Sequence, residues 1–483
     1  MNSIIKYIKT KQSITLYFLL AQITLFLIGI IKIPLYTRLF LPGEIGMYSW
    51  SVAFLSYIDI IFLSWVNATL WRFIYTEKKT KFFFSLLTNI LPLFIVIALI
   101  SFSVTLVLLS LITLPPQIKT LISVGFFSIL SQQVLSFVLF YFHAYKQFKK
   151  WSLVIIIQQI FTLLLFLICY YYFKLGLLGI FYSTIILNTA IILFYSLKHF
   201  NLLKVLITEL RTTYAKDYFK YSYLSIILSL CLMILNNSDR FFIYYLKNET
   251  DLGLYSQYYG LASVGFFSAI QAFNSYFGPS YNLALTKPNA YYINLSVIKL
   301  YLLLFTPLAI FSLINNEVLI NFLFAEKYHG YNSVFNWALI GLYFFGFYNL
   351  LEVRMKFLNQ IKTVIVALTL VVLLNIIANY FFLTIFDFRI ASIISFFCYL
   401  ILLLYSIVKN YSFISKIKLK NAIINLTIAS CLYYILQLLL FQNVEFSSPF
   451  IYLTINFILA FFIYYFTLSK HVFELVNSIE KDN

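Results

Sequence analysis

A few charged side chains stand within long apolar runs of this chain, and they are its strongest candidates for chemistry. They are the cations Lys32, Arg240 and Lys299 and the acids Asp59 and Asp239. A charged side chain at the centre of a membrane helix costs about 3 kcal/mol or more unless it meets water or a counter-charge. We therefore predict that the three cations bind an anionic substrate and that the two acids line a polar cavity. For Lys299, near a helix end, snorkelling to the membrane surface is an equally good explanation.

Uncharged polar residues extend these positions along the same helical faces. Gln132 and His143 share one face of an apolar run with Ser128, and Asn236 lies one helical turn before Arg240. We predict that Gln132, His143 and Asn236 also line the cavity. The alternative is that such polar side chains hold neighbouring helices together through hydrogen bonds.

The elements that must position these residues are membrane-spanning helices. Between Ile14 and Ser469, stretches of about twenty apolar residues alternate with short polar breaks, and we count about fourteen stretches. Hydrophobic residues make up 62% of the 483 and charged residues only 10%. The longest break, Lys198 to Asp217, is too short to form a domain. The sequence therefore predicts an all-α integral membrane protein with about fourteen transmembrane helices.

The distribution of positive charge predicts the orientation of these helices. With the N-terminus placed in the cytoplasm, 25 of the 34 Lys and Arg residues fall in cytoplasmic segments, six in outer loops and three inside helices. This bias is the positive-inside pattern, and it predicts that both termini lie in the cytoplasm. Topology alone explains the net charge of +18, so we expect no nucleic-acid partner.

A short repeat divides the chain into two similar halves. The segment 39–49 recurs without a gap as 246–256, and both copies join an outward-going helix to an inward-going one. Because six spans separate the copies, we expect two lobes related by a pseudo-two-fold axis along the membrane normal. The matched pairs are Glu44 and Asp251, Gly46 and Gly253, Tyr48 and Tyr255, and Ser49 and Ser256. We predict an N-lobe at 1–197, a cytoplasmic linker at 198–217, a C-lobe at 218–409, and a C-terminal helix pair with a short tail at 410–483.

The residues around both copies resemble a known family. The stretch from Ile33 to Ser49 resembles the first-loop signature of Wzx-type polysaccharide flippases, which belong to the multidrug/oligosaccharidyl-lipid/polysaccharide (MOP) exporter superfamily. The segments Tyr218–Ser222 and Asn236–Arg240 resemble the opening of that family's second half. The resemblance implies two six-helix lobes and a final helix pair, which agrees with the helix count above.

The resemblance also implies a substrate and partners. It implies alternating-access translocation of undecaprenyl-diphosphate-linked oligosaccharide units, for O-antigen or capsule synthesis. The partners would be that substrate, membrane lipid, a polysaccharide polymerase and a chain-length regulator. The sequence has no Gly-rich nucleotide-binding loop, so we expect no cofactor. We expect coupling to an H⁺ or Na⁺ gradient, with Asp59 or Asp239 as the exchanging carboxylate.

Two other functions compete with this interpretation. A MATE-like multidrug antiporter shares the two lobes, but it would favour acidic cavity residues, whereas this chain places mostly bases in its helices. A membrane enzyme such as a polysaccharide polymerase would be expected to carry catalytic residues on a large outer loop. The outer loops of this chain are short, and Glu326 and His329 are their only close acid–histidine pair. We therefore expect a transporter and not an enzyme.

Overall fold

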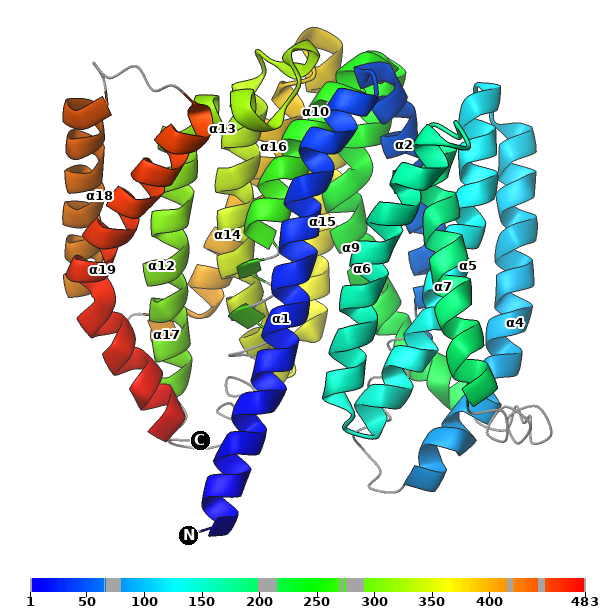
Figure 1. Ribbon diagram of the computed structural model, residues 1–483, viewed down its shortest axis with the longest axis horizontal. Coiled ribbons are helices and arrows are strands. Elements are labelled where there is room, and N and C mark those ends of the chain that lie inside the picture. The colour runs from blue at the N-terminus through cyan, green and yellow to red at the C-terminus, as the bar shows by residue number, and fades with distance from the viewer. Residues whose placement is uncertain are drawn as a thin grey trace. The chain divides into compact units, whose positions relative to one another are not determined.

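In the residues that the computed structural model describes, all regular secondary structure is helical (Figure 1). These residues are 2–64, 66, 80–198, 215–267, 269–270, 273–274, 291–414, 420–441 and 448–481. Thirteen of the described helices are long and apolar enough to cross a membrane, which confirms the predicted all-α membrane fold. They match the predicted spans apart from the eighth, which runs into residues 275–290, outside the described part. Most of the predicted linker 198–217 also lies outside the described residues.

The first half of the chain contains six long spans. The bounds of its helices are α1 Asn2–Leu39, α2 Pro42–Ile58, the π-helix η1 Asp59–Leu63, α4 Thr80–Leu111, α5 Pro116–Ala144, α6 Phe148–Tyr171 and α7 Leu178–Lys198. Prolines open α2 and α5, where the missing N–H leaves no hydrogen bond unmade.

Helices in the second half follow the same order of long spans and then add two more. Their bounds are α9 Ala215–Leu246, α10 Glu249–Ala262, the π-helix η2 Ser263–Phe267, α12 Tyr291–Ile314, α13 Asn316–Leu323, the 3₁₀ helix η3 Glu326–Tyr328, α14 Asn332–Phe357, α15 Ile361–Ile385, α16 Ile390–Lys409, α17 Tyr411–Ile414, α18 Lys420–Phe441 and α19 Pro449–Lys481. The last two are the predicted C-terminal pair.

The contacts divide the chain into two compact units. Unit 1 comprises Met1–Lys32 and Gly43–Gly253, and unit 2 comprises Ile33–Pro42 and Leu254–Asn483. Helix α9 packs with unit 1, although the repeat makes it the first helix of the second half. These units group helices by their contacts and do not test the boundaries that the repeat predicts. Those boundaries stay a prediction.

The repeated turns have the same architecture in both halves. Helix α1 ends at Leu39 and α2 begins at Pro42, while α9 ends at Leu246 and α10 begins at Glu249, each 207 residues later. The acidic residue of each copy lies in the first turn of the following helix, where a negative charge interacts favourably with the helix dipole. Both following helices then run into a π-helix, η1 or η2. The structure thus extends the repeat well beyond the matched sequence.

A second pair of equivalent helix ends supports the repeat. Lys146 after α5 and Asn359 after α14 both adopt a left-handed conformation, with φ of 56° and 60°. The next residue in each case, Gln147 or Gln360, donates its backbone N–H back to a carbonyl five residues earlier, at 2.8 and 2.9 Å. This is the Schellman motif, which satisfies carbonyls at a helix end. The ends of α5 and α14 therefore form the same structural turn, used once in each half.

Apolar side chains cover the outside of many helices as well as the interior. On α15, large apolar residues at helical spacing are 50–62% exposed: Val366, Leu370, Leu373, Ile377 and Phe381. An aqueous protein would place charged residues on such a face, so this stripe fits contact with lipid. Within unit 2, α18 and α19 pack with α12 around the buried residues Leu303, Ala429, Tyr433, Ala460 and Ile463, and Figure 1 shows these helices together.

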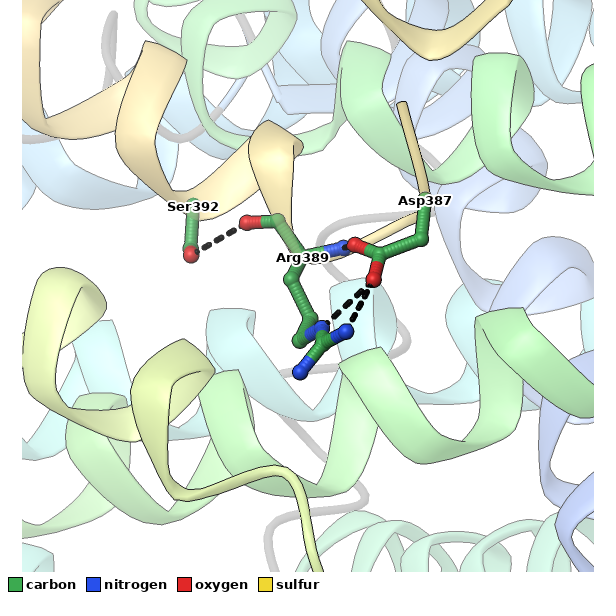
Figure 2. A network of polar contacts seen from close by, with 3 residues as sticks. All are labelled: Asp387, Arg389 and Ser392. Atoms are coloured by element: carbon green, nitrogen blue, oxygen red, sulfur yellow. Dashed lines mark hydrogen bonds and ion pairs between the residues drawn. The ribbon is translucent and has the colours of Figure 1, made fainter. Parts of the chain in front are cut away.

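The short connection between α15 and α16 is held by an ion pair (Figure 2). The Arg389 Nε donates to Asp387 Oδ2 at 2.6 Å, and the Arg389 backbone N–H donates to Asp387 Oδ1 at 2.9 Å. The Ser392 hydroxyl donates to the Arg389 carbonyl at 2.8 Å, within the first turn of α16. The hydrogen bond to Asp387, with its negative charge, raises the pKa of Arg389 above its ordinary value.

Candidate functional site

Lys32 lies on α1 close to the point where the helix passes from unit 1 to unit 2. Its side chain is half-buried, and it has no ion pair or hydrogen bond with any described residue. Pro34 stands two residues later inside the helix, so the Ile30 carbonyl loses its usual N–H donor. The predicted cation is therefore an uncompensated charge beside a weakened stretch of helix.

Asp239 and Arg240 lie next to each other on α9. Asp239 is 1% exposed, and its Oδ1 accepts the Arg240 backbone N–H at 2.8 Å. The Arg240 guanidinium is half-buried and forms no ion pair within the described part of the chain. It lies close enough to Tyr48 and Tyr57 of α2 for its charge to act on both phenols. Asn236, one turn earlier, is also half-buried.

An aromatic cluster joins α2 to α9 beside these charges. Trp50 is 1% exposed and stacks on Phe54 with ring centroids 5.6 Å apart. It also contacts Phe241 edge-on at 5.4 Å, and Tyr57 contacts the same ring at 5.5 Å. Sequence reasoning missed this cluster, because in a chain with 20% aromatic residues Trp50 and Tyr57 do not stand out.

Asp59 lies where α2 becomes the π-helix η1. Its Oδ1 accepts a hydrogen bond from Gln133 Nε2 of α5 at 2.6 Å, and Gln133 is 8% exposed. No described Lys, Arg or His forms an ion pair with it. Short π-helical turns within α-helices, such as η1, occur frequently at functional sites. Sequence analysis singled out the neighbouring Gln132 and not Gln133.

Gln132 belongs to a cluster of amides that joins α5, α6 and α7. The Gln158 Nε2 donates to Gln132 Oε1 at 2.6 Å and to Asn188 Oδ1 at 2.9 Å. The Asn188 Nδ2 donates to Gln132 Oε1 at 3.1 Å and to the Ser131 hydroxyl at 3.2 Å. Asn188 is fully buried. These bonds match the alternative stated for polar stripes, in which amides hold helices together, and a cavity role for Gln132 stays a prediction.

His143 lies among aromatic rings near the end of α5. Its ring meets Phe148 of α6 edge-on at 5.3 Å and Phe18 of α1 at 6.2 Å. Phe18 in turn packs on Trp151 at 4.6 Å, and the Ser152 hydroxyl donates to the Tyr17 carbonyl at 2.7 Å. This cage ties the first part of α1 to α5 and α6, all within unit 1.

Lys299 is the one predicted cation that belongs to unit 2. It is half-buried on α12 and has no ion pair or hydrogen bond with any described residue. The other predicted positions belong to unit 1. Contacts there place the α9 residues beside α2, Asp59 at η1 and Gln132 in the amide cluster, whereas Lys32 and His143 lie apart from these three places. A single cavity that contains them all stays a prediction.

Comparison with known proteins gives a family and a fold. The family described as "Polysaccharide biosynthesis protein" matches residues 13–275. A comparison with curated protein sequences gives no match. Among solved structures, the inward closed conformation of the lipid II flippase MurJ is similar with a TM-score of 0.62 and 15% identity, over 95% of this chain and 99% of that chain.

Two solved structures of MATE transporters are similar at lower scores. A MATE protein in complex with MaL6 has a TM-score of 0.56 and 13% identity, over 84% of this chain and 96% of that chain. The inward-facing conformation of a multidrug resistance MATE transporter of the MOP superfamily has a TM-score of 0.55 and 13% identity, over 83% and 96%. At these identities the structures establish the fold, and the family model covers more than half of the 483 residues. The chain belongs to the polysaccharide biosynthesis protein family and has the fold of the MOP superfamily transporters.

Proposed function

We propose that this protein moves undecaprenyl-diphosphate-linked oligosaccharides from the cytoplasmic to the outer leaflet of a bacterial inner membrane. The product would feed O-antigen or capsule synthesis, with a polymerase and a chain-length regulator acting on it next. Family membership supports a role in polysaccharide synthesis. The likeness to a lipid II flippase supports a fold that can carry a lipid-linked sugar. In this proposal both termini lie in the cytoplasm.

The observation that carries the proposal is a set of cations within the helices that form no ion pair with any described residue. Lys32, Arg240 and Lys299 are half-buried, and none has an ion pair among the described residues. A buried cation left alone is costly, so such positions favour an anionic ligand that supplies the missing charge. The diphosphate of a polyprenyl-linked sugar is an anion of this kind.

The substrate itself explains why a protein is needed. Transfer of one sugar hydroxyl from water to hydrocarbon costs about 4–8 kcal/mol because its hydrogen bonds are lost, and transfer of a phosphate charge costs far more. A hydrated path through the protein, opened alternately to each side, removes this barrier. The polyprenyl tail can stay in lipid, along the exposed apolar residues of α18 and α19, namely Ile428, Leu432, Ile435, Phe457 and Phe461.

An ion gradient would drive the cycle in this proposal. Asp59 and Asp239 are the two acids that the sequence analysis places within apolar runs, and either can exchange H⁺ or Na⁺ as the protein changes conformation. Transport by the Asp59→Asn variant at the wild-type rate would remove Asp59 from this role. Catalysis has no part in the proposal.

The second candidate is a MATE-like multidrug antiporter, which the MATE structures favour at the level of fold. It would bind cationic drugs, and cations repel one another across a low-dielectric site. The basic residues Lys32 and Arg240 therefore weigh against it. A strain that lacks the gene and becomes sensitive to cationic drugs, while its surface polysaccharide is intact, would favour the antiporter.

The proposal is tested in cells and with purified protein. Deletion of the gene should abolish surface polysaccharide and cause the lipid-linked unit to accumulate on the cytoplasmic side. In proteoliposomes, Lys32→Met and Arg240→Met should each lower flipping of the lipid-linked sugar at least tenfold. Lys149→Met, which removes an exposed lysine of α6, is the matched control and should flip at the wild-type rate. Normal surface polysaccharide in the deletion strain would refute the proposed function.

A further inference from the structure

The contact between Gln133 and Asp59 has a consequence beyond the translocation of a sugar. We propose that Asp59 is a proton-exchange site of this protein and that Gln133 is the residue that positions its carboxyl group. The inference deepens the proposed function, on which the use of the proton rests. It selects H⁺ as the coupling ion and assigns a role to a residue that sequence analysis did not single out.

The geometry fixes one oxygen of the carboxyl group. The Gln133 amide donates to Oδ1 at 2.6 Å, which leaves Oδ2 as the atom that gains or loses the proton. In the neutral acid the Oδ2–H bond is intact and Oδ1 is the carbonyl oxygen that accepts the amide N–H. On release the Oδ2–H bond breaks, the proton passes to water, and the carboxylate keeps the same amide donor. No other reactant is needed.

The surroundings of Asp59 are apolar on the elements that pack against it. Helices α4 and α9 pack against η1, and the nearby core consists of Leu63, Ile90, Phe94 and Phe140, with Ile226 of α9 at its edge. A carboxylate there has a single amide as its partner among the described residues. An arrangement of this kind favours a group that changes its protonation when water reaches it.

Within the described residues, the ionisable groups on the neighbouring elements leave Asp59 without an ion-pair partner. From Ile90 to Leu111, α4 carries no ionisable side chain. The ionisable residues that the other elements carry are Glu44, Tyr48 and Tyr57 on α2, Lys119, Tyr141 and His143 on α5, and, from Ile226 onward, Cys231, Asp239, Arg240, Tyr244 and Tyr245 on α9. None of the basic residues forms an ion pair with Asp59 within the described chain. Within the described part of the chain, no fixed salt bridge therefore accounts for the acid.

Comparison with the second half of the chain shows whether the Asp59–Gln133 pair is needed to form the π-helix. Helix α10 ends in the π-helix η2, Ser263–Phe267, which contains no acid. There Phe266 packs edge-on against Phe305 at 5.5 Å. The position on α14 that corresponds to Gln133, 213 residues later as for the ends of α5 and α14, is Gly346. Because η2 forms without a carboxyl–amide pair, the pair is not needed to make the π-helix, and its presence in one half alone points to a function.

The test uses infrared difference spectroscopy of the purified full-length protein during a pH titration. The carbonyl stretch of a protonated carboxyl group should appear in the wild type and be absent in Asp59→Asn. In Gln133→Met, which keeps the length of the side chain but removes the donor, the band should persist at higher frequency and titrate at a different pH. Gln132→Met, one residue away, is the matched control and should leave the Asp59 band unchanged.

The outcomes separate this inference from the proposed function. A band that Asp59→Asn does not remove, or that Gln133→Met leaves at the wild-type frequency, would overturn the inference even if the protein flips lipid-linked sugars. A band that behaves as expected would support the proton site even if flipping is absent, in which case the proposed function fails alone. Abolition of the band by Na⁺ at constant pH would also overturn the choice of the proton.

Discussion

Gly46 of α2 lies against the backbone carbonyl of Glu249, the first residue of α10, so closely that a Cβ on Gly46 would overlap the carbonyl oxygen. Both residues belong to the repeated turns, and both lie in unit 1. Gly46, the glycine of the first copy of the repeat, is therefore required by close packing. It lets the starts of two equivalent helices approach each other.

We predict that Gly46→Ala destabilises the protein, because the clash is with backbone and cannot be relieved by turning a side chain. Overpacking of this kind costs about 1–3 kcal/mol. Gly43→Ala is the matched control in the same turn, since a Cβ there meets Glu249 Cγ at an ordinary 3.4 Å. Thermal unfolding in detergent should give a lower melting temperature for Gly46→Ala alone. Equal melting temperatures for the two variants would contradict this account.

Sequence reasoning predicted what depends on composition along the chain. The apolar runs predicted the spans, and the repeated segments 39–49 and 246–256 predicted the turns that precede α2 and α10. Each of these follows from a local property. Sequence therefore located the membrane helices and the charged positions within them.

The partners of the polar residues could not be predicted in the same way. Which side chain reaches Asp59 depends on the rotation of α5 about its axis, and a shift of one residue turns a helix by about 100°. The prediction named Gln132, whereas the neighbouring Gln133 makes the contact. Gln158 and Asn188 lie on other helices, and no periodicity links them to Gln132. The π-helix η1 also has no clear sequence signal, because it depends on packing.

The buried amides of Asn188 and Asn456 should respond to substitution in opposite ways. Asn188 makes hydrogen bonds to Gln132, Gln158 and Ser131, so Asn188→Leu leaves buried partners unsatisfied and should cost about 1–3 kcal/mol. Asn456 on α19 is fully buried, and neither atom of its amide has a partner among the described residues. Asn456→Leu should therefore be at least as stable as the wild type. Thermal unfolding of both variants checks this, and a larger loss for Asn456→Leu would refute it.

The ion pair between Asp387 and Arg389 should make the same contribution to stability throughout the neutral range. The pKa of Arg389 is raised by its partner, so the stabilisation is complete below the ordinary arginine pKa and is lost only in strong alkali. The contribution is small because both side chains are 47% exposed. The difference in melting temperature between the wild type and Arg389→Gln should thus be small and constant from about pH 6 to about pH 9. A difference that grows across this range would contradict the assignment.

Arg354 should hold the short helix α17 against the end of α14. Its Nη1 donates to Asn410 Oδ1 at 3.0 Å, and its guanidinium lies 4.3 Å from the centre of the Phe413 ring. Arg354→Lys keeps the charge but loses the planar group that makes both contacts, so hydrogen exchange in α17 should become faster. Lys362→Gln, which alters an exposed residue at the start of α15, is the control and should leave exchange in α17 unchanged. Unchanged exchange in Arg354→Lys would show that α17 is held by other contacts.

The end of α1 should depend on Tyr328 for its order within unit 2. The fully buried phenol of Tyr328 donates to the Phe40 carbonyl at 3.1 Å, and the Ala325 N–H donates to the Thr37 hydroxyl at 3.3 Å. Tyr258 supports this loop from the other side, since its hydroxyl donates to the Tyr328 carbonyl at 2.7 Å. Tyr328→Phe removes one hydrogen bond and keeps the ring, so it should cost about 1 kcal/mol. Hydrogen exchange should become faster near Phe40.

Tyr331→Phe is the matched control for this substitution. Its ring packs on Phe388 at 5.1 Å, and no hydrogen bond joins its hydroxyl to any described residue, so the variant should match the wild type in melting temperature and in exchange near Phe40. Exchange near Phe40 that is as fast in Tyr331→Phe as in Tyr328→Phe would mean that the effect does not come from the hydrogen bond of Tyr328. Faster exchange in Tyr328→Phe alone would establish that a residue 288 positions away keeps the end of α1 ordered.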